Sequence, residues 1–261
     1  MARIVAVANQ KGGVGKTTTT INLAASLAKA GKHVLLVDVD PQANLTSGVG
    51  QKGKSAPAGT IYNALTSDAP DIDLSSYMLP TGIEGLKLIP ADSSLTGAEI
   101  ELVALPEREA RLRRVLQPRP DFDYVFIDCP PSLGLLTLNA LVAADAVLIP
   151  LHCEYFALEG LADLIGTLRR VRAALNPALD IEGVLLTMFD ERTNLGQQVA
   201  LDVRQFFKDK VFHTVIPRNV KLGEAPSHGM PAILYDVRSR GAAAYLALAR
   251  EILERSEPTA A

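Results

Sequence analysis

The chain has 261 residues, of which 48% are hydrophobic, and a formal net charge of −3 at pH 7. This length and composition allow one large α/β domain with a substantial core, and the charge excludes a histone-like polycation while leaving local basic patches open. The two cysteines, Cys129 and Cys153, form no C-x-x-C pair and favour reduced thiols in a cytosol. The short apolar start before Lys11 predicts no signal peptide, and the longest apolar stretch, residues 140–151, is too short to span a bilayer.

The first predicted elements are a strand, a glycine-rich loop and a helix. An apolar run over residues 4–8 predicts the strand, and helical spacing of apolar residues over 21–28 predicts the helix. Between them, residues 9–18 read Asn-Gln-Lys-Gly-Gly-Val-Gly-Lys-Thr-Thr. Small residues let backbone N–H groups approach an anion and the helix N-terminus adds its dipole, so this context predicts a phosphate cradle.

Two side chains of this loop have the chemistry of nucleotide binding. Lys16 is placed to reach the β- and γ-phosphates, and the Thr17 hydroxyl is placed to ligate Mg²⁺. The loop departs from the standard G-x-x-x-x-G-K-[ST] pattern, because Gln10 replaces the first glycine and an additional lysine, Lys11, follows it.

The remaining elements alternate between apolar strands and helical patterns. In the first half we expect a strand over 33–40 that Pro41 ends, a mobile Gly-, Ser- and Lys-rich loop over 46–59, a short helix over 61–65, a strand over 86–90 and a helix over 99–116 broken at Pro106. In the second half we expect strands over 124–128, 146–151, 181–188 and 211–216, and helices over 133–144, 158–175, 195–210 and 241–255.

This alternation indicates an α/β fold with a doubly wound, mostly parallel sheet and helices on both faces. In such sheets, ligands bind outside the carboxyl ends of the strands. The glycine-rich loop, Asp38, Asp40 and Asp128 all lie at the carboxyl ends of predicted strands. Their agreement predicts one nucleotide site at that edge of the sheet.

The three carboxylates have different expected roles. Asp128 ends an apolar strand as a Walker B aspartate does, and we expect it to hold Mg²⁺ through a water opposite Thr17. Asp40 is the better candidate for orienting the attacking water, because phosphoryl transfer needs positioning more than covalent help. Asp38 either supports the metal shell or caps its strand. No arginine is placed by local sequence as a finger, so a second cation must come from elsewhere.

Five motifs resemble those of one family across nearly the whole chain. They are KGGVGKTT at residues 11–18, DVDPQ at 38–42, FIDCPPS at 126–132, EYFALEG at 154–160 and IPRNV at 216–220. With them the chain resembles the deviant Walker A ATPases, and most closely the ParA/Soj chromosome-partitioning proteins of the ParA/MinD superfamily. The resemblance implies a single P-loop ATPase domain over residues 1–261, with a flexible tail at about 256–261.

The resemblance also implies a shared nucleotide site. In this family two subunits sandwich two ATP molecules, and the additional lysine, here Lys11, reaches the partner's nucleotide and supplies the missing cation. Gly12 would lie where the two backbones approach closely, so a side chain there should block the dimer. Gly13, Val14, Gly15 and Thr18 complete the nucleotide-binding loop. Pro217 and Asn219 match the family's adenine-contacting segment.

Family members bind DNA without sequence preference, and only as the ATP-bound dimer. The candidate contacts are basic residues, three of them near loops late in the chain: Arg192, Arg218, Lys221, Arg238 and Arg240. A ParB-type centromere-binding protein is the expected partner that stimulates hydrolysis, in a cytoplasmic protein associated with the nucleoid. The cluster Arg169, Arg170 and Arg172 is interpreted as a solvated helix face.

Three other functions have the same kind of phosphate loop. A MinD-like membrane switch would need a basic, apolar terminal helix, whereas residues 250–258 are mixed in charge and lysine-free, which predicts no membrane partner. An iron–sulfur reductase would need cluster cysteines farther from the Walker B acid than Cys129. A small-molecule synthetase of the dethiobiotin or cobyrinic type is disfavoured by the DVDPQ and IPRNV segments. The histidines, His33, His152, His213 and His228, have no metal-ligand spacing.

Overall fold

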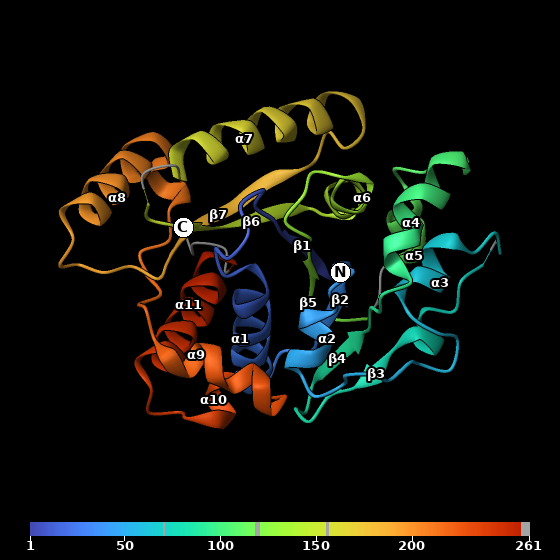
Figure 1. The fold of residues 1–261 in the computed structure, drawn as a ribbon, viewed down its shortest axis with the longest axis horizontal. Coiled ribbons are helices and arrows are strands. Elements are labelled where there is room, and N and C mark those ends of the chain that lie inside the picture. The colour runs from blue at the N-terminus through green and yellow to red at the C-terminus, as the bar shows by residue number, and fades with distance from the viewer. Residues whose placement is uncertain (70, 118–120, 155–156, 257–261) are drawn as a thin grey trace.

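The computed structural model describes residues 1–69, 71–117, 121–154 and 157–256. Within these residues seven strands form one sheet in the order β3-β4-β2-β5-β1-β6-β7 (Figure 1). The strands are β1 Arg3–Val7, β2 Val34–Asp38, β3 Leu79–Pro80, β4 Leu86–Ile89, β5 Tyr124–Asp128, β6 Ala146–His152 and β7 Asp180–Thr187. All neighbours pair in parallel except β3 and β4, which confirms the mostly parallel sheet.

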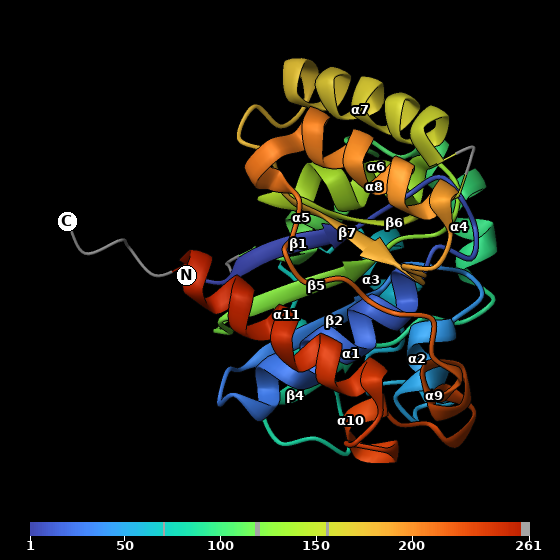
Figure 2. The ribbon, with the colours of Figure 1, turned by 90° about the vertical axis from the view of Figure 1, so that its left-hand side faces the viewer.

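Helices cover both faces of this sheet, as the doubly wound prediction requires (Figure 2). One face carries α1 Lys16–Lys29, α2 Asn44–Gly48, α9 Val220–Glu224, α10 Ala232–Tyr235 and α11 Arg240–Ser256. The other carries α3 Ile61–Thr66, α4 Leu95–Glu101, α5 Arg111–Val115, α6 Leu135–Ala143, α7 Ala157–Ala174 and α8 Asn194–Phe207. Short 3₁₀ helices occupy Leu74–Tyr77, Leu102–Ala104, Lys208–Lys210 and Ala225–His228.

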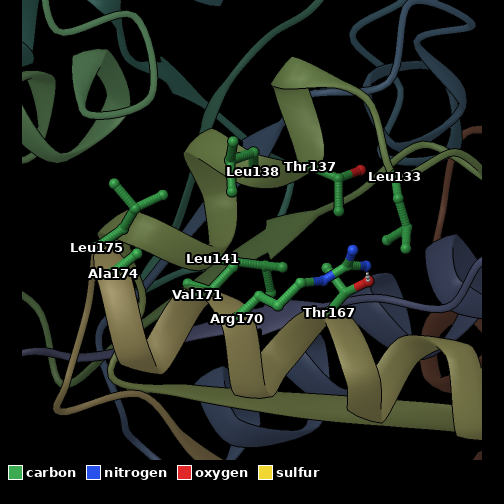
Figure 3. A pocket seen from close by; sticks show the side chains of 9 residues that line it. All are labelled: Leu133, Thr137, Leu138, Leu141, Thr167, Arg170, Val171, Ala174 and Leu175. Atoms are coloured by element: carbon green, nitrogen blue, oxygen red, sulfur yellow. Dashed lines mark hydrogen bonds between the residues drawn. The ribbon is translucent and has the colours of Figure 1, made fainter.

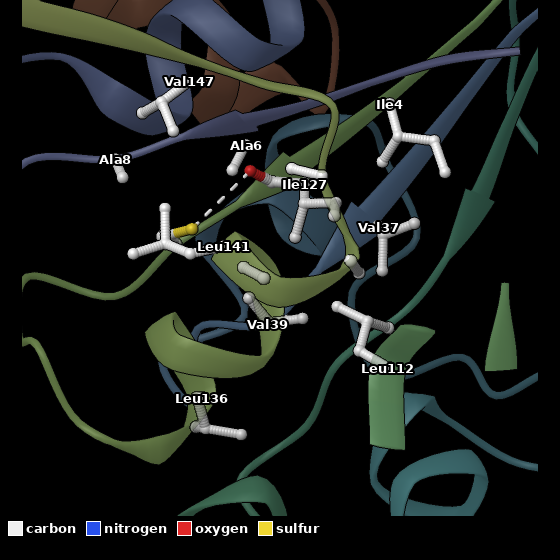
Figure 4. Packing of buried hydrophobic residues seen from close by; sticks show 14 of the residues in the cluster. Ile4, Ala6, Ala8, Val37, Val39, Leu112, Ile127, Leu136, Leu141 and Val147 are labelled. Carbon is white, nitrogen blue, oxygen red and sulfur yellow. Dashed lines mark hydrogen bonds between the residues drawn. The ribbon is translucent and has the colours of Figure 1, made fainter. Parts of the chain in front are cut away.

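The strand pattern divides the core into two clusters, one on each face. Along β1, Ile4 and Ala6 belong to the cluster under α3–α8, whereas Val5 and Val7 belong to the cluster under α1 and α11. Successive side chains of a strand point to opposite faces, so a strand buried on both sides is continuously apolar. Figure 4 shows the first cluster, where residues of β1, β2 and β5 meet side chains of α5 and α6.

The register of the central strands aligns the functional edge. Asp38 at the end of β2 pairs with Asp128 at the end of β5, and Asp128 pairs with Val7 at the end of β1. The loop after β1 therefore begins beside both carboxylates, and α1 starts directly after it at Lys16. This arrangement places the glycine-rich loop at the carboxyl edge, as predicted.

One predicted strand is wrong, and two other predictions need adjustment. Residues 211–216 form no strand; they lie along β7 with separate bridges at Val211 and Pro217. Phe212 and Ile216 donate backbone hydrogen bonds to β7, but the residues between them do not continue the ladder. Pro217 has no N–H to extend it. The segment nevertheless covers the edge of the sheet.

The predicted loop over 46–59 begins inside a helix. Asp38 Oδ2 accepts hydrogen bonds from the backbone N–H of Thr46 (2.9 Å) and from its hydroxyl (2.7 Å), and Leu45 and Val49 are buried, which together stabilise α2. The predicted break at Pro106 is confirmed, because helical structure ends at Ala104 and resumes at Arg111. Helix α11 ends at Ser256, where the predicted tail of about 256–261 begins, and residues 257–261 lie outside the described residues.

Candidate nucleotide site

The glycine-rich loop has the backbone that the sequence predicts for an anion cradle. Gly13 and Gly15 have positive φ angles of +72° and +89°, which side chains with a Cβ rarely adopt. Gly15 is the N-cap of α1 and no side chain caps the helix, so its first N–H groups remain without a side-chain acceptor. A cradle of this kind, at the positive end of a 14-residue helix, suits a phosphate group.

Hydrogen bonds to two neighbouring strands, β6 and β7, hold the loop in place. The Asn9 amide donates to the carbonyl of Pro150 on β6 (2.8 Å) and accepts from the backbone N–H of Lys11 (3.0 Å). The Thr187 hydroxyl at the end of β7 donates to the carbonyl of Val14 (2.8 Å). The sequence assigned no role to Asn9 or Thr187, and the only signal for Thr187 is its position at the end of a strand.

Lys16 is buried, with 7% of its surface exposed. Its ammonium donates to the carbonyl of Lys11 across the loop (3.2 Å). Burial lowers the pKa of Lys16, and the nearby carboxylates of Asp128 and Asp40 partly offset that effect. The ammonium therefore lies inside the cradle with two acids close enough to act on it.

Asp128 is fully buried and held by two hydroxyls of α1. Thr17 donates to Oδ2 (2.7 Å) and Thr20 donates to Oδ1 (3.1 Å). Burial raises the pKa of Asp128 to about 8, with repulsion from Asp38 adding to the effect. The structure brings Thr17 and Asp128 together as predicted, whereas the contact of Thr20 was not expected from sequence.

Asp38 is committed to internal hydrogen bonds. Besides Thr46, it accepts from the backbone N–H of Asp40 (3.2 Å), and Thr46 in turn accepts from the backbone N–H of Ala91 (3.0 Å). Burial raises the pKa of Asp38 to about 6, against the lowering effect of these hydrogen bonds. Of its two expected roles, these contacts favour the structural one, in which Asp38 ties β2 to α2 and to the segment after β4.

Asp40 lies two residues after Asp38, in the loop that follows β2, and 6% of its surface is exposed. Its Oδ1 accepts from the backbone N–H of Gln42 (2.9 Å), which fixes the start of the loop that leads to α2. The charge of Asp40 acts on both Lys16 and Asp128, so the structure places it with the predicted site. Its other carboxylate oxygen, Oδ2, forms no hydrogen bond with a described residue.

Lys11, unlike Lys16, is paired at the surface. Its ammonium contacts Glu154 Oε2 (2.8 Å), and the other Glu154 oxygen contacts His152 Nδ1 (3.1 Å). The hydrogen bond from Lys11 lowers the pKa of Glu154, while burial lowers the pKa of His152. Sequence analysis identified the motif beginning at Glu154 without this role; Tyr155 and Phe156 of that motif lie outside the described residues.

Gly12 lies exposed at the outer side of the loop. A Cβ built on it would meet only Pro131, at 3.9 Å, an ordinary contact. No requirement of this chain's own packing among the described residues therefore explains a glycine at this position.

Pro217 and Asn219 lie where the segment after β7 turns into α9. Pro217 bridges to Phe189, and Asn219 Oδ1 accepts from the backbone N–H of Lys221 (2.9 Å) as the N-cap of α9. Asn219 thus has a local structural role beside its expected contact with adenine.

The five predicted DNA contacts fall into two groups. Arg192 pairs with Asp190 (2.7 Å) and Lys221 with Glu224 (2.9 Å). Arg218, Arg238 and Arg240 are exposed and form no ion pair with a described residue. Arg218 lies close enough to Glu154 and to Asp190 for its charge to act on both carboxylates.

The donor set fits a nucleotide with a divalent cation. The loop offers backbone N–H groups and the Lys16 ammonium to an anion, and the Thr17 hydroxyl beside the Asp128 carboxylate provides hard oxygen donors of the kind Mg²⁺ prefers. A cation there would also favour the charged form of Asp128, which burial opposes. Among the described residues, no group of three or more His, Cys, Asp or Glu side chains is placed to hold a metal ion by itself.

Comparison with known proteins identifies the family to which this chain belongs. Residues 2–181 match a family model described as an AAA domain. The chain is 56% identical over 259 residues to the chromosome partitioning protein ParA of Myxococcus xanthus, covering 99% of this chain and 90% of the relative. It is 58% identical over 253 residues to the sporulation initiation inhibitor protein Soj of Bacillus subtilis, covering 97% and 98%.

The chain belongs to the ParA/Soj family of chromosome-partitioning ATPases. Among solved structures it is similar to the cobyrinic acid a,c-diamide synthase of Mycobacterium smegmatis with bound ADP and magnesium, at 39% identity and a TM-score of 0.83 over 98% of this chain and 95% of that one. It is also similar to the cell division ATPase MinD of Pyrococcus furiosus, at 28% identity and a TM-score of 0.79 over 98% and 100%. In the part of this ParA/Soj family member that the structure describes, no helix has the length and apolar character needed to cross a membrane.

Proposed function

We propose that this protein is an ATP-dependent switch for DNA partitioning. In this proposal ATP binding drives formation of a sandwich homodimer, the dimer binds double-stranded DNA without sequence preference, and hydrolysis to ADP and phosphate releases it. The observation that carries the proposal is the contrast between the two loop lysines. Lys16 is buried within the cradle, whereas the Lys11 ammonium pairs at the surface with an exposed carboxylate.

Within one subunit, the loop residues Gly12–Thr18 would bind the phosphates and Lys16 would neutralise them. The Thr17 hydroxyl would ligate Mg²⁺ directly and Asp128 would hold it through a water. A bound Mg²⁺ would offset charge on the β- and γ-phosphates. Asp40 would orient the attacking water, which its position near Lys16 and Asp128 supports. Pro217 and Asn219 would contact adenine.

Dimerisation would complete this site. Lys11 would leave Glu154 and reach the nucleotide of the partner subunit, adding the second cation that hydrolysis needs. An exposed ion pair such as Lys11–Glu154 contributes only about 0–1 kcal/mol to stability, so breaking it to form the dimer costs little free energy. Gly12 would face the partner's backbone, which would account for a glycine that packing among the described residues does not require.

DNA binding would follow from doubling a weak basic surface. Arg218, Arg238 and Arg240 form no ion pair with a described residue, and Arg192 and Lys221 would exchange a carboxylate partner for phosphate. A ParB-type centromere-binding protein would stimulate hydrolysis, and the ATP-bound dimer would locate to the nucleoid in the cytoplasm. We also propose that residues 1–261 act as one P-loop ATPase domain.

The decisive experiment measures dimerisation and DNA binding with ATP, with ADP and without nucleotide. Size-exclusion chromatography and gel mobility should show a dimer and a DNA shift only with ATP. Lys11→Ala should keep ATP binding but lose ATPase activity, whereas Lys16→Ala should lose ATP binding itself. The matched control is Lys29→Ala, because Lys29 lies in the last turn of α1, the helix that Lys16 begins. This variant should bind and hydrolyse ATP as the parent does. A DNA shift of equal strength without nucleotide would contradict the switch.

A MinD-like membrane switch is the alternative. The apolar face of α11 is buried in the described structure, with Tyr245, Leu248 and Ile252 in the core, so this helix offers no free apolar face to a bilayer. Sedimentation with liposomes and ATP would favour the alternative if the protein pelleted.

A synthetase function is the other alternative, since the 39% identical solved structure is named as a cobyrinic acid a,c-diamide synthase. Two relatives with higher identity, at 56% and 53%, are named chromosome partitioning protein ParA. Phosphate release that responds to a small substrate and not to DNA would favour the synthetase.

A further inference from the structure

A groove between α6 and α7 lies apart from the nucleotide loop (Figure 3). Its volume is about 330 Å³, near the lower end of the range of about 300–1,000 Å³ for ligand pockets. Its walls are mostly apolar: Leu133, Leu138, Leu141, Val171, Ala174 and Leu175. A concave apolar surface of this size accommodates a few aliphatic side chains from another molecule.

A guanidinium group lies at this groove without a carboxylate. Figure 3 shows the Arg170 side chain lying along the groove toward Leu133 and Thr137. Its guanidinium donates to the Thr167 hydroxyl (3.1 Å), and Arg170 forms no ion pair with a described residue. At the other end of the groove, Arg113 of α5 donates to the carbonyl of Leu175 (3.4 Å). Each end of the groove therefore has an arginine, which favours an anionic occupant.

The exposed surface of α7 carries two further arginines beside Arg170. Arg169 and Arg172 are exposed next to Arg170, and neither forms an ion pair with a described residue, although Arg172 lies near the charge of Asp180. This concentration of arginines belongs to a chain with a net charge of −3. A solvated helix face explains exposed arginines, but it does not explain an apolar groove beside them.

We propose that this groove docks an acidic, amphipathic helical segment of a partner protein. The apolar side of the segment would insert aliphatic side chains between α6 and α7, and its Asp or Glu residues would pair with Arg170 and Arg113. The groove is concave, so it suits protruding side chains better than the surface of a bilayer, and DNA would use the arginines without filling the apolar part.

The groove also contacts the loop that follows Asp128. Leu133 lines the groove, and Thr137, another lining residue, donates to the carbonyl of Ser132 (2.6 Å). A segment docked there would touch both α6 and the loop between Asp128 and α6. Docking is therefore expected to restrain this loop, independently of the surface that binds DNA.

The test is a selection of helical peptides against the full chain. A display library of peptides of about fourteen residues holds two leucines at i and i+4 and varies the other positions. Selected peptides are synthesised, and their affinities for the parent and for four variants are measured by fluorescence anisotropy. Thermal unfolding of each variant checks that it folds. The readout needs neither ATP nor DNA, so it is independent of the proposed switch.

Two pairs of exposed positions on α7 provide matched controls. Arg170 and Ala174 line the groove, whereas Arg169 and Ala173 do not. We expect selected peptides rich in Asp and Glu with Kd values of about 100 µM or tighter. Arg170→Glu and Ala174→Glu should each weaken binding about tenfold or more, while Arg169→Glu and Ala173→Glu should weaken it less than about threefold.

Several results would overturn the proposal. They are the absence of any enriched peptide, enrichment of neutral or basic peptides, and equal losses from the groove and control variants. Vesicles of phosphatidylglycerol and phosphatidylcholine are tested in parallel. Vesicle binding that requires Arg170, without peptide binding, would replace the peptide with a membrane surface.

Discussion

The nucleotide loop and the segment 211–240 differ in how their functional side chains are held. At the loop, Asn9 donates to Pro150 of β6, Thr187 of β7 donates to Val14, and Thr17 donates to the buried Asp128. In the later segment, Arg218 and Arg238 are exposed and form no ion pair with a described residue. The first region is built for one fixed geometry, and the second presents charge with freedom to adjust. Single substitutions in the loop should therefore cause large losses of ATP binding or hydrolysis. Substitutions in the later segment should each reduce DNA affinity by a smaller factor that depends strongly on salt.

The largest expected effect comes from removing the buried ammonium of the loop. Lys16→Ala should weaken ATP binding by about a hundredfold or more, because the phosphates lose a cation in a site largely shielded from water. Isothermal titration calorimetry with ATP and Mg²⁺ measures the change. Affinity within about threefold of the parent would contradict the assignment of the cradle.

The second effect concerns hydrolysis rather than binding. Asp40→Ala should bind ATP but lower turnover by about a hundredfold, since the carboxylate near Lys16 and Asp128 would no longer orient water. The variant should accumulate as an ATP-bound dimer on DNA, which gel mobility and phosphate release would show together. Turnover at the parental rate would exclude Asp40 as the residue that positions water.

The third effect tests the adjustable region. Arg218→Glu should weaken DNA binding by about tenfold or more while leaving the ATP-dependent dimer intact, because each dimer loses two cations and gains two anions. Arg169→Glu is the control for total charge. If the two variants weaken DNA binding equally, the proposed DNA surface is wrong. For the parent, about six phosphate contacts would mean a loss of about a thousandfold in affinity between 50 and 200 mM salt.

The fourth effect is on stability and pH. The pKa values of Asp38 and Asp128 are raised to about 6 and about 8 by burial. Between about pH 4 and pH 8 the folded protein therefore binds more protons than the unfolded chain, so these two groups make stability fall as pH rises through that window. In Asp128→Asn this fall should be smaller. The difference in melting temperature between pH 5 and pH 8 should be about 7–14 °C smaller than in the parent.

Differential scanning fluorimetry without nucleotide measures this slope, and the exposed substitution Asp163→Asn is its control. Mg²⁺ with nucleotide should also flatten the slope in the parent, because a cation at Asp128 favours its charged form. An Asp128→Asn slope equal to that of the parent would show that the buried acid does not control the pH dependence.

The smallest effect concerns the exposed partner of Lys11. Glu154→Gln removes the ion pair without changing the size of the side chain, so it should release Lys11 and shift dimerisation with ATP by less than about fivefold, in the direction of tighter association. Analytical ultracentrifugation with ATP measures the shift. Weaker association would mean that Glu154 contributes to the dimer instead of restraining Lys11.

The sequence predicted the fixed region well for a physical reason. Continuous apolar runs over 4–8 and 124–128 specify strands buried on both faces, and residues that end such strands must lie together at one edge. Asp128 and Lys16 were therefore located without the structure. The ParA/Soj family was also identified from local motifs. The motifs at residues 11–18, 38–42 and 126–132 all lie at or next to the carboxyl ends of the central strands.

The sequence failed where structure depends on distant partners. Residues 211–216 are rich in β-branched and aromatic residues, as strands are, but whether they pair continuously depends on β7 and on Pro217. The roles of Thr187 and Thr46 depend on contacts with Val14 and Asp38, which no local pattern reveals. The partner of Lys11 is 143 residues away in the chain, so periodicity could not identify it.

The hydrogen bond between Thr17 and Asp128 has a stereochemical consequence. A hydroxyl has one proton and two lone pairs, and at 2.7 Å from Oδ2 the Thr17 proton is directed at the carboxylate. Both lone pairs must then point away from Asp128 Oδ2 and stay available to another partner. An incoming cation would find the oxygen already oriented to coordinate it, and the hydroxyl would keep its proton and its hydrogen bond while doing so.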